Sequence, residues 1–258
     1  MLNAILIRDF RIYSRNKTYL NIFILYVFIL CAIVFGMLWF VNISKKTLNS
    51  EYGTSISFIL FIFISSAIYS ICPALAVNIV SSEKNDFYLI KPTFLRNYQI
   101  ITSKVIFVIT HVLIFILLSF PIMILVISIA GFSLKILFYC YLVTFISALA
   151  FCIMGILWSS VFGKMIALSL TCISVGIFSI GTILTPLTIT KIIKAKLSAD
   201  IINILYGLSP FWILSRKISE SNLPDKIFTI PLWFYPIFVY FLISVITISL
   251  TFVFVRKW

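Results

Sequence analysis

Long uncharged apolar stretches, separated by polar connections, run along most of the chain. Each stretch has about 20 residues or more, the length that an α-helix needs to cross roughly 30 Å of hydrocarbon. Strands would alternate apolar and polar residues, and an open sheet edge cannot lie in lipid. The pattern therefore predicts an all-α polytopic membrane protein, a single membrane domain over 1–258 with about six transmembrane helices. The expected spans are 21–43, 55–80, 105–129, 136–157, 166–187 and 232–255.

The segment before the first span, 1–20, has a different pattern, typical of an amphipathic interfacial helix. At 100° per residue its arginines and its apolar residues fall on opposite faces. The arginines are Arg8, Arg11 and Arg15, and the apolar residues are Leu2, Leu6, Phe10 and Tyr13. We expect this helix to lie in the headgroup layer, with its arginines toward anionic lipid or a cytoplasmic partner. The alternative is a basic segment that only fixes membrane orientation.

Composition supports the membrane assignment and excludes two other classes. The chain is 62% hydrophobic and 10% charged, against about 25% charged residues in soluble domains. Its mean hydropathy is +1.19. The net charge of +13 comes from short basic clusters beside apolar stretches, without the dense basic face of a nucleic-acid binder. We therefore expect no soluble fold and no nucleic-acid partner.

The positive-inside rule predicts that both termini are cytoplasmic. The terminal segments and the second and fourth connections carry eleven Lys and Arg residues, and the first and third connections carry three. The long fifth connection, 188–231, carries six more, but long connections translocate with little regard to charge. It is also rich in Ile, Leu and aromatic residues, so we expect an extracellular segment that is re-entrant or lies on the outer leaflet.

Catalytic chemistry is not visible in the chain. There is no phosphate-binding loop, carboxylate pair or metal-binding spacing, so we expect no catalytic residue, no metal and no cofactor in this chain. The expected spans contain no Asp, Glu, Lys or Arg, which argues against an ion- or proton-coupled carrier. His111 is the only histidine, and packing is the favoured interpretation because a proton relay needs a second titratable group nearby.

Hydroxyl and small residues recur within the second and fifth expected spans. Close helix packing is the favoured interpretation, and a weakly polar path for an amphipathic cargo is the alternative. The candidate path residues are Ser65, Ser66, Tyr69, Ser174 and Thr182.

The connection 82–104 resembles the first cytoplasmic connection of type-2 ABC exporter permeases. Glu83, Pro92, Arg96 and Lys104 match that family's acidic residue, proline, basic residue and helix-opening lysine in type and order. The family's usual Gly-Thr is replaced here by Phe87-Tyr88. The resemblance implies that this connection couples the chain to an ATPase subunit. The residues it assigns to coupling are Glu83, Asp86, Pro92, Arg96, Tyr98 and Lys104.

The same resemblance implies a function and partners. The chain would be the membrane subunit of an ATP-driven exporter in a bacterial cytoplasmic membrane, paired with a second permease, expected to be a second copy of itself. Two copies of a separate ABC ATPase would bind ATP and magnesium. The cargo is expected to be hydrophobic or amphipathic, such as a peptide, a toxin or a drug. A secondary transporter or channel, and a non-transporting immunity or scaffold protein, are the alternatives.

Overall fold

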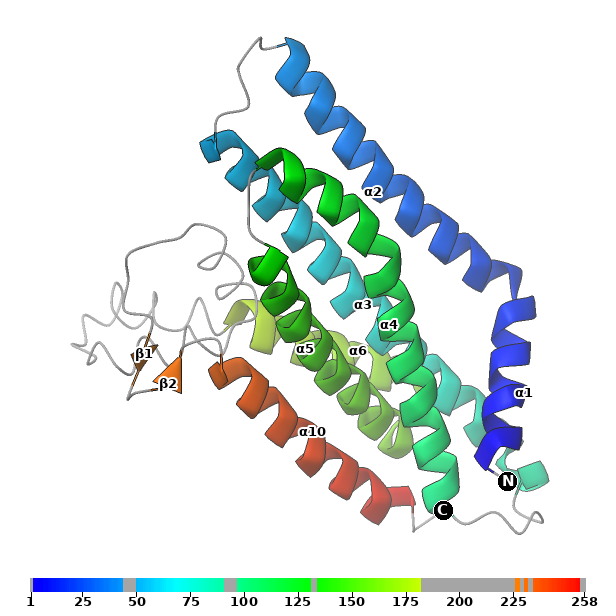
Figure 1. The fold of residues 1–258 in the computed structure, drawn as a ribbon. Coiled ribbons are helices and arrows are strands. Elements are labelled where there is room, and N and C mark those ends of the chain that lie inside the picture. Colours follow the sequence, from blue (N-terminus) through cyan, green and yellow to red (C-terminus); the bar gives the residue numbers. More distant parts are fainter. Residues whose placement is uncertain are drawn as a thin grey trace.

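The computed structural model describes residues 2–43, 50–90, 97–130, 134–181, 226–227, 230–231 and 234–255. Apart from one short strand pair, these residues form helices (Figure 1). The long helices are α2 (Lys17–Ile43), α3 (Ser50–Ile90), α4 (Asn97–Ala130), α5 (Leu134–Val161) and α10 (Phe234–Val255). The shorter elements are α1 (Leu2–Arg15), α6 (Lys164–Gly176), the π-helical turn η1 (Ile177–Gly181), β1 (Lys226–Ile227) and β2 (Ile230–Pro231).

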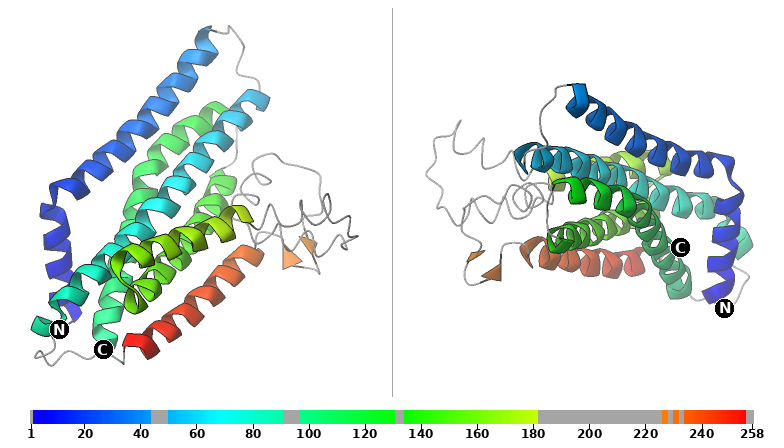
Figure 2. Two further views of the ribbon diagram at one scale, coloured as in Figure 1. Left: turned by 180° about the vertical axis from the view of Figure 1, so that it is seen from behind. Right: turned by 45° about the horizontal axis from the view of Figure 1, so that its top comes forward.

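The long helices form one bundle with α3 and α5 at its centre. Helix α5 makes its most extensive contacts with α3 and α10, and α3 also packs on α4 and α6. Helices α2 and α10 lie on opposite flanks of the bundle (Figure 2). Much of the apolar surface of both flanking helices is exposed, as expected for segments that face lipid.

Five described helices are long and apolar enough to cross a membrane. They cover five of the six expected spans, so the prediction of a helical, polytopic membrane architecture is confirmed. The fifth expected span, 166–187, is described only as far as residue 181, where α6 continues into η1. Helix α6 runs back along the bundle (Figure 2). Helix α10 ends at the end of the bundle at which α1 begins (Figures 1 and 2), and we call this end the basic end.

Helical structure reaches further into the expected connection 82–104 than the sequence pattern indicated. Helix α3 continues to Ile90 and α4 begins at Asn97, so only 91–96 lie between them. An α-helix satisfies its own backbone hydrogen bonds, so it can extend beyond the apolar stretch without leaving its interior backbone groups unpaired. The expected outer segment 188–231 lies outside the described residues, except for β1 and β2, which pair antiparallel.

Gly155 allows the central helices to pack closely. A Cβ atom at this position would lie 3.1 Å from the carbonyl oxygen of Pro73 in α3 and 3.5 Å from the Thr171 side chain in α6. Small residues at such crossings let helix backbones approach each other within a membrane. Gly155 therefore sets the spacing between α5, α3 and α6.

Candidate functional site at the junction of α1 and α4

A buried ion pair joins α1 to the beginning of α4. The Lys104 ammonium lies 2.5 Å from Oδ2 of Asp9, and the side chains of the two residues are 3% and 5% exposed. Oδ1 of the same carboxylate accepts hydrogen bonds from the Arg8 guanidinium, at 3.3 Å from Nε and 3.1 Å from Nη2. Buried charges are tolerated only when they are paired and hydrogen-bonded. The pair therefore fixes how α1 is placed on α4.

An aromatic cluster formed by residues of α1, α2 and α4 extends the contact. The ring of Phe10 lies 5.0 Å from that of Phe107, and the ring of Tyr13 lies 5.1 Å from it. The Tyr19 ring, at the start of α2, makes an edge contact with Tyr13 at 5.6 Å. Burial, with the nearby Asp9 carboxylate, raises the pKa of Tyr13 to about 12, so its hydroxyl stays neutral at physiological pH. The apolar face of α1 thus packs on protein.

His111 completes the cluster. Its ring stacks on Phe10 at 5.7 Å, lies 3.9 Å from the ring of Phe107 and meets Tyr19 edge-on at 5.2 Å. Its Nδ1 lies 2.7 Å from the carbonyl oxygen of Phe107. The side chain is buried and enclosed by aromatic rings, which favours the packing interpretation of this histidine.

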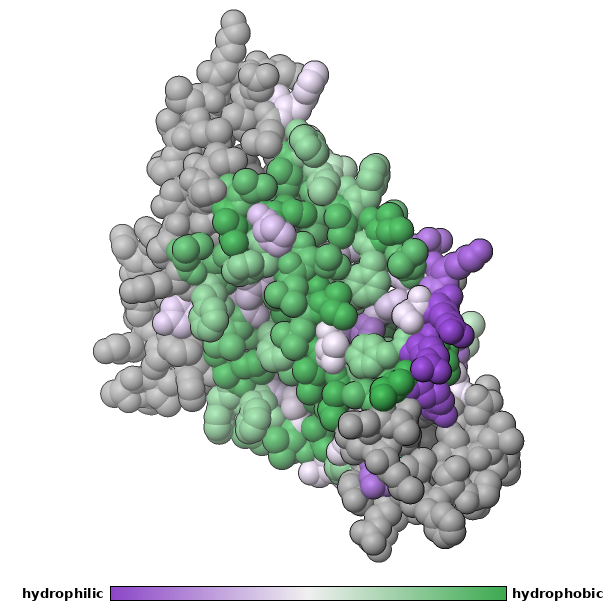
Figure 3. Space-filling view, turned by 45° about the vertical axis from the view of Figure 1, so that its right-hand side comes forward, coloured by the Kyte–Doolittle hydropathy of each residue, from purple (hydrophilic) through white to green (hydrophobic). Residues whose placement is uncertain are grey.

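The opposite face of α1 is exposed and basic. Arg8, Arg11, Arg15 and Lys17 are all exposed. Strongly hydrophilic residues form a band on a surface that is otherwise mostly hydrophobic (Figure 3). The arrangement of arginines and apolar residues on opposite faces of 2–15 therefore agrees with the pattern expected from the sequence.

Four of the six expected coupling residues lie in helices α3 and α4. Glu83 and Asp86 lie in the last turns of α3, and Tyr98 lies in the first turn of α4. Pro92 and Arg96 lie outside the described residues. Lys104 was expected to belong to the connection, but it lies within the apolar part of α4, Gln99–Leu125, with its charge turned onto Asp9.

Four of the five candidate path residues lie in described helices of the bundle and form hydrogen bonds there. The Ser65 and Ser66 hydroxyls donate to carbonyl groups of their own helix, α3. The Tyr69 hydroxyl lies 2.6 Å from that of Ser147 in α5. The Ser174 hydroxyl donates to the Leu170 carbonyl and accepts from the Trp158 indole. Thr182 lies outside the described residues. The bonds of Ser65 and Ser66 stay within α3, whereas Tyr69 and Ser174 also bond to residues of α5.

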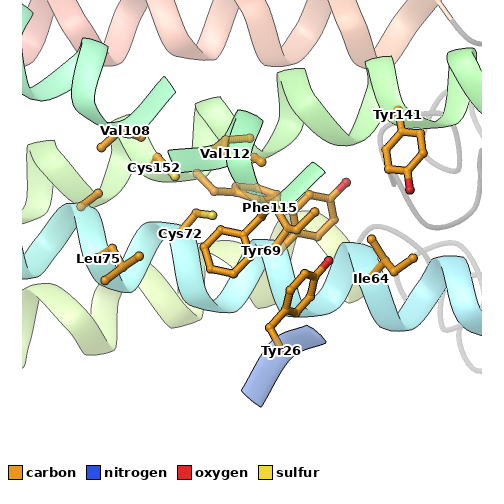
Figure 4. Close-up of a cluster of buried hydrophobic side chains, with 14 of the residues drawn as sticks. Tyr26, Ile64, Tyr69, Cys72, Leu75, Val108, Val112, Phe115, Tyr141 and Cys152 are labelled. Carbon is orange, nitrogen blue, oxygen red and sulfur yellow. The ribbon is translucent and has the colours of Figure 1, made fainter. Parts of the chain in front are cut away.

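The bundle interior also contains polar contacts that the sequence did not indicate. Ser81 and Ser159 join α3 to α5 at 2.8 Å, and Ser119 joins Tyr141 across α4 and α5 at 3.0 Å. Figure 4 shows Tyr26, Tyr69 and Tyr141 among apolar side chains of this core. Such pairs depend on helix register, which residue type alone does not reveal.

Asp9 is the residue of this candidate site that the sequence pattern did not single out. It is the only acidic residue of α1, and at 100° per residue it lies on the side of Tyr13, among the apolar positions. That position was the signal, because a lone carboxylate on an apolar face needs a buried partner. Within the described residues, no group of His, Cys, Asp or Glu has the arrangement of a metal site.

Comparison with known proteins leaves the family open. No family model matches the chain, and no curated protein matches it.

Proposed function

We propose that this chain is the membrane subunit of an ATP-driven exporter of the type-2 ABC permease kind. It would move a hydrophobic or amphipathic cargo, such as a peptide or toxin, out across a bacterial cytoplasmic membrane. The observation that carries the proposal is the α3–α4 hairpin at the basic end. The sequence 82–104 has the family's order of Glu83, Pro92, Arg96 and Lys104, and only 91–96 separate the two long apolar helices.

The proposed topology has six spans with both termini in the cytoplasm. The apolar helix Lys164–Ile180 has 17 residues, which at about 1.5 Å per residue gives roughly 26 Å, close to the hydrocarbon thickness. Counting it as the fifth span returns the chain to the side on which it began. This arrangement agrees with the shared end of α1 and α10 (Figure 1).

The coupling hairpin would transmit force from a separate ATPase. Two ATPase subunits that close on ATP and magnesium would push on the hairpin of each of two permease copies. Rigid-body motion could then shift the bundle between two packings. The Asp9–Lys104 pair supports this scheme, because it ties α1 to the first turns of α4 and so lets both move together.

Purification of the tagged chain in mild detergent from the membranes of its source bacterium tests the proposal. We expect an ATP-binding subunit to co-purify. Glu83→Gln and Arg96→Gln should each reduce its recovery, because both remove a charge from the expected contact. Lys135→Gln, at the other end of the bundle, is the matched control and should change nothing. Purification without any ATPase, together with cargo flux in liposomes that needs an ion gradient and no ATP, contradicts the proposal.

A further inference from the structure

The exposed face of α1 carries arginines and no carboxylate of the helix itself. Asp9 is the only acidic residue of the helix, and it is turned inward onto Lys104. Arg8, which also contacts Asp9, keeps 43% of its side chain exposed. Arg11 and Arg15 are exposed on the same face. The fold therefore separates the charges of α1, and the outward surface is cationic.

The end of the basic face lies close in sequence to the apolar stretch of α2. Helix α1 ends at Arg15, and the apolar stretch of α2 begins four residues later at Tyr19. Four residues correspond to about 6 Å of helix, which falls within a headgroup layer of roughly 5–8 Å. Backbone hydrogen bonds fix the corner between the helices, since the Asn16 carbonyl oxygen accepts from the amide of Tyr19 at 3.0 Å.

Exposed isoleucines border the basic face on both sides. Ile7 and Ile12 are each 56% exposed. At 100° per residue, Ile7 lies 40° beyond Arg11 and Ile12 lies 40° beyond Arg8, so the arginines lie between them. An apolar border suits the boundary between headgroups and acyl chains, whereas the rim of a protein–protein contact is polar. The surface therefore fits lipid better than an acidic protein.

We propose that the outward face of α1 binds the headgroups of anionic phospholipids in the leaflet at the basic end. Guanidinium groups pair with phosphate through two parallel hydrogen bonds, which makes arginine well suited to this contact. Contacts of Asp9 and Phe10 with α4 hold the helix in place before lipid binds. Lipid binding therefore costs little conformational entropy of the protein. The site involves no ATPase, and its test is independent of the proposed export function.

Lipid selectivity of the full chain in nanodiscs tests the inference. The discs contain equimolar phosphatidylcholine and phosphatidylglycerol, and electron paramagnetic resonance compares the motional restriction of the two spin-labelled lipids. We expect a preference for phosphatidylglycerol that weakens in about 1 M salt, where charges are screened within about 3 Å. Arg11→Gln with Arg15→Gln should reduce this preference by roughly 5-fold for each arginine.

Matched variants separate this site from net charge alone. Arg11→Lys with Arg15→Lys should retain most of the preference, and Lys164→Gln, an exposed cation in the first turn of α6, should retain all of it. The inference is wrong if the double glutamine variant keeps the parental preference, or if Lys164→Gln lowers it equally. It is also wrong if the double glutamine variant keeps its preference for phosphatidylglycerol and instead loses the binding of an acidic protein. Should that variant fail to fold, the lysine variant and the salt response of the parent decide the question.

Discussion

Replacing Asp9 with Asn should release α1 from the bundle. The substitution removes the carboxylate that lies 2.5 Å from the ammonium of Lys104, whose side chain is only 3% exposed. Removing one partner of a buried pair costs about 3–5 kcal/mol, because the other charge stays buried. A factor of ten in an equilibrium corresponds to about 1.4 kcal/mol, so the population of undocked α1 should rise roughly 100- to 4,000-fold.

Hydrogen exchange measured by mass spectrometry reports this change without added labels. A helix of 14 residues is marginally stable alone, so undocking exposes the amides of α1 to exchange. Exchange over 2–15 should accelerate by the factor given above, up to the limit set by global opening. Peptides from the centre of α5 should keep their protection, because they do not contact the pair.

Two further variants test the role of the Asp9–Lys104 pair. Arg8→Gln removes a partly exposed partner of the same carboxylate and should cost at most about 1 kcal/mol. Asp9→Leu combined with Lys104→Met replaces the pair by apolar side chains and should restore most of the protection. The proposed role of the ion pair in docking α1 is refuted if Asp9→Asn exchanges within about threefold of the parent, or if the double apolar variant exchanges as fast as Asp9→Asn.

Three other predictions concern thermal unfolding in detergent. His111→Ala should lose about 3 kcal/mol, or roughly 6–12 °C in melting temperature, and His111→Phe much less, because a phenyl ring keeps the aromatic contacts; equal losses would point to a chemical role for the imidazole. Gly155→Val should cost about 1–3 kcal/mol through overpacking against the carbonyl of Pro73, whereas Gly176→Val, with open space around its Cβ position, should be nearly neutral; the same loss at both would contradict this account of helix spacing. Tyr69→Phe removes the bond to Ser147 and should cost about 0.6 kcal/mol, the average across membrane helices; a loss beyond about 2 kcal/mol would give this hydroxyl a larger role than packing.

The membrane-spanning architecture was predictable because its signal is local. An apolar stretch of about 20 residues has few stable arrangements other than a helix in lipid, and helix periodicity places Arg8, Arg11 and Arg15 on one face. The described spans accordingly begin and end near their expected limits. The ends of α3 and α4 differ more, because charged residues can continue a helix beyond the membrane. Hydropathy marks where the apolar stretch ends and does not mark where the helix ends.

The candidate site could be predicted only in part. The basic face of α1 follows from its own sequence, but the position of Lys104 does not. A lysine before an apolar stretch has the pattern of a span boundary, and nothing local shows that a carboxylate 95 positions earlier covers it. The hydroxyl pair of Tyr69 and Ser147, 78 positions apart, was hidden for the same reason.

The sequence by itself determined that this chain is helical and lipid-embedded, and that a basic amphipathic segment precedes its first span. The tertiary structure decided that Asp9 turns inward, that Lys104 is buried against it and that the arginines of α1 face outward. The physical reason is that hydropathy and periodicity belong to single segments, whereas the pairing of charges depends on how two helices are placed against each other. That placement fixes α1 on α4 and leaves the arginines of α1 exposed at the basic end of the bundle.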